Sequence, residues 1–188
     1  PDIGSLFEPR SVAVIGASPN PAKIGYKIVE NILSDGYKGK VYPINPKGGE
    51  VLGLPIYRTL EEVAGEVDLA TIVIPARAAL SAVEACAAKG VKFLSVITSG
   101  FSEVGNNEDE RKMVELARAT GMRVLGPNIF GIFSSKVSLN ATFGPGGIRP
   151  GKVAIVTQSG ALGIAMIGKT AVENIGLSAI ISVGNKAD

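Results

Sequence analysis

The sequence lacks several residue types on which common functional sites depend. It contains no histidine and a single cysteine, Cys86. A lone cysteine excludes an internal disulfide and any metal site built from several cysteines. Cys86 lies in the segment AVEACAAKG, which has the composition of a helix packed on a core. We therefore expect a small buried residue there rather than a reactive thiol.

Long apolar runs and clustered basic residues are also missing. Mean hydropathy is +0.30, yet no apolar stretch approaches the ~18 residues of a membrane-spanning helix. The net charge is +2, the basic residues are scattered, and there are only four Tyr and six Phe, so no basic face typical of nucleic-acid binding is visible. The chain starts at Pro1 without a signal-peptide pattern. We expect a cytoplasmic protein that binds neither membranes nor nucleic acids.

Strand-like segments alternate with helix-like segments over the first two thirds of the chain. The strand-like segments are nearly continuous apolar runs, as in parallel strands that are buried on both faces. Five strand–helix units in series predict an α/β fold with a Rossmann-like, doubly wound parallel sheet. The strand-like segments cover residues 11–16, 40–45, 69–75, 92–100 and 122–127.

Helix patterns fill the intervals between these strands. Segments 25–36, 79–90 and 107–121 each end in a glycine, which is typical of a helix C-terminus. Residues 58–65 predict a short helix in which Thr59 is the N-cap and Glu62 completes a capping box.

A region rich in Gly, Pro and Ser divides the chain. We expect a linker loop at 129–150 between a domain at 1–128 and the start of a second, flavodoxin-like domain at 151–188. The second part holds one strand–helix–strand unit, which cannot cover both faces of its sheet. We therefore expect a piece of a longer protein, whose exposed sheet edge favours pairing with another chain, including a second copy.

The loop after the first strand is the first candidate site. Residues 12–25 read VAVIGASPNPAKIG, which is nearly a dinucleotide-binding turn without its second glycine. Helix N-terminal amides beside a lysine suit an anion such as pyrophosphate. The alternative is a tight strand–helix turn that holds no ligand. The candidate ligand-binding residues are Gly16, Ala17, Ser18, Lys23 and Gly25.

The loop after the second strand carries a base where an NAD enzyme would carry an acid. An Asp or Glu there would bind the ribose hydroxyls, but this chain has Pro46 and Lys47. A lysine suits a phosphorylated ribose, as in NADP or at the 3′-phosphate of coenzyme A. The alternative is a solvated loop lysine.

Later strand ends give weaker signals. Ile74 and Pro75 form an apolar exit over which a ligand could pass, and Thr98 and Ser99 end the fourth strand. Asn128 is either an amide contact to a ligand or an Asx turn. In the second domain, Ser159, Gly160 and Ala161 open a helix, which makes them either an anion site or a plain serine N-cap.

Six of these motifs, in this order, resemble one known family. The chain is similar to the α part of the NDP-forming acyl-CoA synthetases, which include succinyl-CoA synthetase, and above all to the ADP-forming acetate–CoA ligases. The motifs are VAVIGAS (12–18), INPKGG (44–49), VIP (73–75), ITSGF (97–101), LGPN (125–128) and TQSGALG (157–163).

The resemblance implies a coenzyme A site along the strand ends. Its phosphates would lie at the first loop, its adenosine-phosphate end at Pro46 and Lys47, and its thiol end near Asn128. A phosphate at the reaction centre would lie at Ser159, Gly160 and Ala161. The pantetheine path would follow Ile74, Pro75, Ile97, Thr98 and Ser99.

The resemblance also implies an activity and its partners. Family members convert acyl-CoA, ADP and phosphate into acid, CoA and ATP through an acyl phosphate and a phosphorylated histidine. This chain contains no histidine, and ADP or ATP with Mg²⁺ would bind on an ATP-grasp β subunit or domain outside it. We expect no metal site and no catalytic residue here, so the chain alone should bind CoA without turnover. Succinyl members have a glutamate in place of Ser99.

Two other interpretations stay open on the sequence. The same domains occur fused to acetyltransferases, where they look like acyl-CoA sensors. An NADP-dependent oxidoreductase would use Lys47 for the 2′-phosphate, but no Tyr–Lys pair or histidine base stands in a recognisable place.

Overall fold

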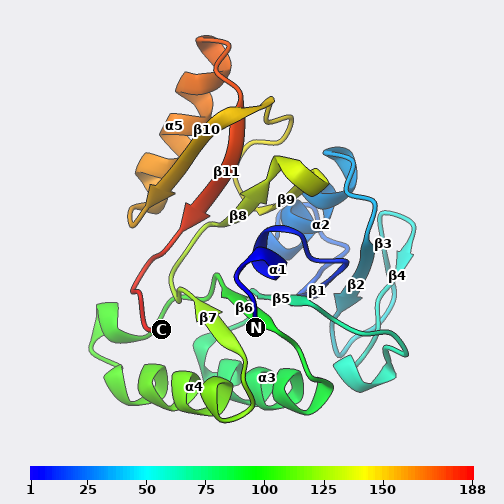
Figure 1. Ribbon diagram of the computed structural model, residues 1–188. Helices are drawn as coiled ribbons and strands as arrows, with labels where there is room; N and C mark the ends of the chain where they lie inside the picture. Colours follow the sequence, from blue (N-terminus) through cyan, green and yellow to red (C-terminus); the bar gives the residue numbers. More distant parts are fainter.

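A five-stranded parallel sheet organises the first two thirds of the chain (Figure 1). The computed structural model describes residues 1–188. The sheet order β2-β1-β5-β6-β7 reverses direction beside β1, which is the doubly wound arrangement expected from the sequence. Its strands are β1 (Ser11–Ile15), β2 (Lys40–Ile44), β5 (Leu69–Ile72), β6 (Phe93–Val96) and β7 (Arg123–Leu125).

Helices cover both faces of this sheet because its strands are apolar on both sides. All five residues of β1 are buried. Val12 and Val14 face the core beneath α2, whereas Ala13 and Ile15 face the core beneath α3 and α4. The helices are α1 (Gly4–Phe7), α2 (Ile24–Ser34), α3 (Ala76–Lys89) and α4 (Asn107–Ala119), and the short 3-10 turns are η1 (Leu60–Glu62) and η2 (Ser102–Val104).

Local details agree with the sequence in some places and differ in others. Gly90 adopts a left-handed conformation at the end of α3, as expected. The predicted capping box is wrong: residues 60–62 form only a 3-10 turn, and the Glu62 carboxylate accepts from the amide of Arg58 instead of that of Thr59. Cys86 is fully buried, and burial raises the pKa of its thiol to about 12, so the expectation of an unreactive core residue is confirmed.

The expected linker loop is the main difference in the fold. Residues 129–150 contain two buried strands that join the second sheet, whose order is β10-β11-β8-β9. An asparagine in this region is typical of a loop, yet the Asn140 side chain is fully buried and donates to the Asp35 carboxylate. The remaining elements are β3 (Glu50–Val51), β4 (Leu54–Pro55), β8 (Gly131–Ser134), η3 (Ser135–Val137), β9 (Leu139–Thr142), β10 (Pro150–Thr157), α5 (Gly160–Val172) and β11 (Leu177–Ser182).

The second sheet packs against α2 on one side and leaves its far edge open. Ile132, Leu139 and Ala141 share a core with α2. At the other edge β10 is largely exposed, with 46% of Val153 and 65% of Val156 accessible to solvent. None of the helices is both long and apolar enough to span a bilayer.

An ion cluster joins the amino ends of three central strands. Asp68, Arg10 and Lys92 each precede a strand by one residue. The carboxylate of Asp68 lies 2.7 Å from Lys92 Nζ and 3.2 Å from Arg10 Nε, and its side chain is only 3% exposed. Burial alone would raise the pKa of Asp68, but the hydrogen bonds from Arg10 and Lys92 outweigh it and lower the pKa to about 2.

We expect Asp68→Asn to lower the free energy of unfolding at pH 7 by about 2 kcal/mol. Because the pKa in the folded protein is depressed, this stability is present above the unfolded pKa of 3.8 and is lost as the pH falls toward 2. Urea unfolding at several pH values should show the difference between variant and parent shrinking over that window. Glu66→Gln is the control, since Glu66 is the exposed partner of Arg10 and should change stability little. A constant Asp68→Asn effect at every pH would contradict this assignment.

Candidate functional site

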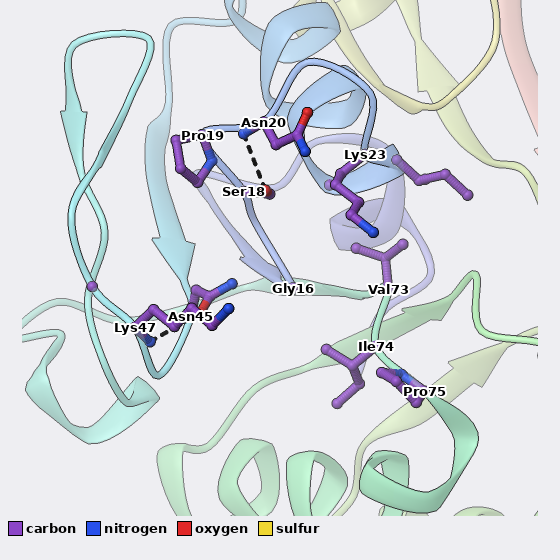
Figure 2. A pocket seen from close by; sticks show the side chains of 13 residues that line it. Gly16, Ser18, Pro19, Asn20, Lys23, Asn45, Lys47, Val73, Ile74 and Pro75 are labelled. Carbon is purple, nitrogen blue, oxygen red and sulfur yellow. Dashed lines mark hydrogen bonds between the residues drawn. The ribbon is translucent and has the colours of Figure 1, made fainter.

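A cleft of about 600 Å³ opens at the carboxyl ends of β1, β2 and β5. This is the point where the strand order reverses, and ligands of doubly wound folds bind there. Figure 2 shows Lys23 on the α2 side, Asn45 and Lys47 on the β2 side, and Ile74 and Pro75 on the β5 side. The lining residues are Gly16, Ser18, Pro19, Asn20, Lys23, Ile24, Gly25, Asn45, Lys47, Gly48, Val73, Ile74 and Pro75.

Two glycines allow α2 to start directly on the turn after β1. Gly16 has φ +105°, and a Cβ there would collide with the Val73 carbonyl. A Cβ on Gly25 would collide with the Gly16 carbonyl oxygen and lie 3.1 Å from the Ala17 Cα. These are the turn and helix-packing roles of the first and third glycines of a dinucleotide-binding motif. The chain keeps both roles without the middle glycine.

The loop between these glycines is held by its own polar side chains. Ser18 Oγ accepts from the Asn20 amide at 3.1 Å, and Asn20 Oδ1 accepts from the Ala22 amide at 2.9 Å. Prolines 19 and 21 restrict it further. The loop therefore arrives at α2 in a fixed conformation.

The start of α2 presents unpaired donors to the cleft. Lys23 occupies the N-cap position but supplies no side-chain cap. The first two helical amides, of Ile24 and Gly25, have no partner within the helix or from the loop. With the positive end of the helix dipole, these donors form an environment suited to an anion.

The loop after β2 is fixed by Asn45. Its amide nitrogen donates to the Ala17 carbonyl at 2.8 Å, and its Oδ1 accepts from the Lys47 amide at 3.0 Å. Asn45 thus ties the second loop to the first and forms an Asx turn that presents Lys47.

The cleft is basic. Lys23 and Lys47 line it, neither forms a salt bridge, and no carboxylate is among the lining side chains. The structure also contains no group of His, Cys, Asp or Glu arranged to hold a metal ion. The arrangement is chemically suited to binding phosphates at the walls and an apolar chain over Ile74 and Pro75.

The structure brings together seven of the residues that the sequence analysis selects. Gly16, Ser18, Lys23, Gly25, Lys47, Ile74 and Pro75 all line the cleft. Ala17 lies fully buried beneath the loop. Pro46 is exposed, and its carbonyl accepts from Arg58 at 3.4 Å.

The residues expected along the fourth and fifth strand ends lie beyond this cleft. Ile97 and Thr98 are buried, and the Thr98 hydroxyl donates to the Ile74 carbonyl at 2.7 Å. Ser99 and Asn128 are exposed at the carboxyl ends of β6 and β7. Asn128 has φ +61° and contacts Asn185.

At the start of α5, the plain-cap interpretation describes what the structure contains. Ser159 Oγ accepts from the Leu162 amide at 3.2 Å, as an ordinary N-cap does. Ser159 and Ala161 are exposed, and Gly160 is half-buried. A phosphate at this turn stays a prediction.

The sequence analysis missed six lining residues, among them Asn45. The signal for Asn45 was available, because Asn-Pro-Lys-Gly is an Asx-turn pattern directly after a strand. The others lie inside the quoted stretches 12–25, 44–49 and 73–75, but nothing in their residue types marked them as lining residues. The missed residues are Pro19, Asn20, Ile24, Asn45, Gly48 and Val73.

Family comparison agrees with this geometry. Residues 10–134 match the model described as CoA binding domain. The chain belongs to the CoA-binding domain family. Residues 150–188 match a second model, described as the succinyl-CoA ligase like flavodoxin domain. The CoA-binding match extends through β8, so this strand is part of the family's own domain pattern rather than of a linker.

Relatives of this chain include ADP-forming CoA ligases. It is 52% identical to the acetate–CoA ligase [ADP-forming] I subunit alpha of Pyrococcus furiosus over 98% of its length. It is 38% identical to the 4-hydroxybutyrate–CoA ligase [ADP-forming] of Nitrosopumilus maritimus over 97% of its length. The chain spans only 41% and 26% of these relatives.

A solved structure has the same fold over the whole chain. The dinucleotide-forming acetyl-coenzyme A synthetase 1 of Ca. Korarchaeum cryptofilum, in complex with phosphate and ADP, matches with a TM-score of 0.97 and 55% identity. The match covers 100% of this chain and 40% of that one.

We expect Gly25→Ala to lower the free energy of unfolding by about 1–3 kcal/mol, because the new methyl group meets backbone rather than a movable side chain. The matched control is Gly168→Ala in α5, where nothing lies within 4 Å of the added Cβ. That change should stabilise by up to about 1 kcal/mol, the usual gain from glycine to alanine inside a helix. Chemical denaturation of both variants checks the pair. Equal stability of Gly25→Ala and the parent would show that α2 can move away from the β1 turn.

Proposed function

We propose that this chain binds coenzyme A in the cleft and forms the CoA-binding part of an ADP-forming acyl-CoA ligase. The observation that carries the proposal is a basic cleft at the strand-order reversal, with unpaired helix amides and no carboxylate for ribose hydroxyls. The similarity to ADP-forming ligases over nearly the whole chain supports it.

The pyrophosphate of CoA would occupy the start of α2. Gly16 and Ser18 form the loop wall, Ala17 supports it from below, and Gly25 allows the close approach. Lys23 would neutralise the charge. The middle glycine of the dinucleotide-binding motif is missing, and hydrogen bonds of Ser18 and Asn20 hold the loop in its conformation instead. A loop of this kind fits the pyrophosphate of CoA.

The 3′-phosphate would bind to Lys47. The Asx turn at Asn45 holds the backbone of Lys47, with Pro46 between the two. The absence of an acidic residue from the cleft walls favours a phosphorylated ribose over NAD. This arrangement alone also fits NADP, which is therefore the second ligand to test.

The pantetheine arm would leave the cleft over Ile74 and Pro75 and pass Ile97, Thr98 and Ser99 toward Asn128. In support, these residues follow β5, β6 and β7, whose carboxyl ends lie along one edge of the sheet. A phosphate of the reaction would meet Ser159, Gly160 and Ala161. A Cβ on Gly160 would lie 3.9 Å from Phe130, which is two residues past Asn128, so the two loops are neighbours.

The rest of the reaction would need parts outside this chain. A phosphorylated histidine cannot come from a sequence without histidine, and ADP would need an ATP-grasp β subunit or domain. The exposed edge of β10 supports contact with such a part or with a second copy. The acyl group is a separate question, because acetate and 4-hydroxybutyrate both appear in the names of relatives.

We expect the chain alone to bind CoA but to form no ATP from acetyl-CoA, ADP and phosphate. A coupled ATP assay run beside a CoA titration checks both halves. ATP formation by this chain alone would overturn the proposal that the phosphorylated histidine and the ADP site lie outside it.

We expect Lys47→Ala to weaken CoA about tenfold while leaving dephospho-CoA unchanged, because only CoA carries the 3′-phosphate. Titration calorimetry with CoA, dephospho-CoA and NADP measures this. Lys38→Ala serves as the charge-matched control, since Lys38 does not line the cleft.

Binding of NADP without binding of CoA would instead favour the oxidoreductase. An equal loss of affinity for CoA and dephospho-CoA would show that Lys47 does not bind the 3′-phosphate, while CoA would still be the ligand.

A further inference from the structure

The segment after β11 returns to the first domain. The Asn185 amide donates to the Pro127 carbonyl at 2.9 Å, and the Ala187 amide donates to the Gly126 carbonyl at 3.0 Å. Gly184 lies so close to the carbonyls of Pro127 and Asn128 that no side chain would fit. Residues 184–187 are therefore packed directly on the loop after β7.

The side chain of Asn185 joins two carboxylates at this contact. Its Nδ2 donates to Glu103 Oε2 at 2.6 Å and to Glu110 Oε2 at 2.8 Å. Its Oδ1 accepts from Asn128 Nδ2 at 3.3 Å. One amide thus uses all its polar atoms on residues from two other loops and α4.

The same two carboxylates hold the loop after β6. Glu103 Oε1 accepts from the amides of Gly100 and Phe101, the latter at 3.2 Å. Glu110 Oε2 accepts from the Ser102 amide at 3.1 Å. The position of this loop therefore depends on carboxylates that Asn185 keeps together.

We propose that Asn185 is a positioning residue for the pantetheine end of bound CoA. It fixes the loop that carries Ser99 and the side chain of Asn128, and so makes the end of the second sheet part of the ligand site. This inference rests on the proposed CoA function.

The chemistry gives a specific consequence of removing the amide. Without Asn185 Nδ2, the carboxylates of Glu103 and Glu110 would face each other with no shared donor, and like charges at short range repel. The Asn128 side chain and the carboxylates that hold the loop after β6 would lose the amide that they share, and the bond from the Asn128 amide to the Thr98 carbonyl at 3.0 Å would be left as the direct link between the two loops. The cleft at β1 and β2 would be unaffected, because none of its lining residues contacts Asn185.

The test compares CoA with adenosine 3′,5′-bisphosphate, which lacks the pantetheine arm and the second phosphate of the pyrophosphate. We expect Asn185→Ala to weaken CoA about tenfold and to leave the affinity for the bisphosphate unchanged. Gly184→Ala, which pushes the segment off the β7 loop, should reproduce this pattern. Asn107→Ala is the control, because it removes the same side chain from an exposed site at the start of α4. Circular dichroism of each variant measures separately whether it is folded, and only folded variants are compared.

The outcomes distinguish the role of Asn185 from the proposed binding of CoA. A parent chain that binds neither ligand would overturn both proposals. A parent chain that binds CoA, with variants that lose CoA and bisphosphate equally or lose neither, would overturn the role of Asn185 alone. Equal affinity of the parent for the two ligands would do the same, since the pantetheine arm would then make no contact to position.

Discussion

The contact between Gly25 and the Gly16 carbonyl is the constraint on which the site depends. It places the first turn of α2 on the end of β1, so that the unpaired amides of the helix open at the sheet edge. The opposite half of α2 is anchored by Asn31, which is buried and donates to the carbonyls of Thr142 and Gly144 at 2.9 Å each. One helix therefore spans from the cleft to the second sheet.

The two ends of the parallel sheet differ in how their charged groups are paired. At the amino ends, Asp68 is surrounded by donors that satisfy it. At the carboxyl ends, the cations and helix amides have no protein partner. The first arrangement stabilises the folded chain, whereas the second leaves charge available for a ligand.

Much of this could be predicted from the sequence, because the periodic signals were strong. Continuous apolar runs such as SVAVI identified the central strands, and the loop GASPNPAKIG (16–25) after β1 identified one wall of the cleft. The region 129–150 could not be read in this way. Its polar residues, such as Asn140 and Thr142, satisfy one another inside the protein, so the composition resembles that of a loop. The hydrogen bonds of Asn185 could not be predicted from the sequence for a different reason. They join residues 57 to 82 positions apart, which no local pattern connects.

The buried position of Cys86 has a consequence for redox chemistry. Coenzyme A carries a thiol of its own, and mixed disulfides form when a protein thiolate is accessible. The only sulfhydryl of this chain is enclosed by α3 and the sheet, and burial keeps its pKa near 12, so almost none is ionised at neutral pH. Oxidised CoA has no accessible partner here, and CoA held by this chain would stay exchangeable under oxidising conditions.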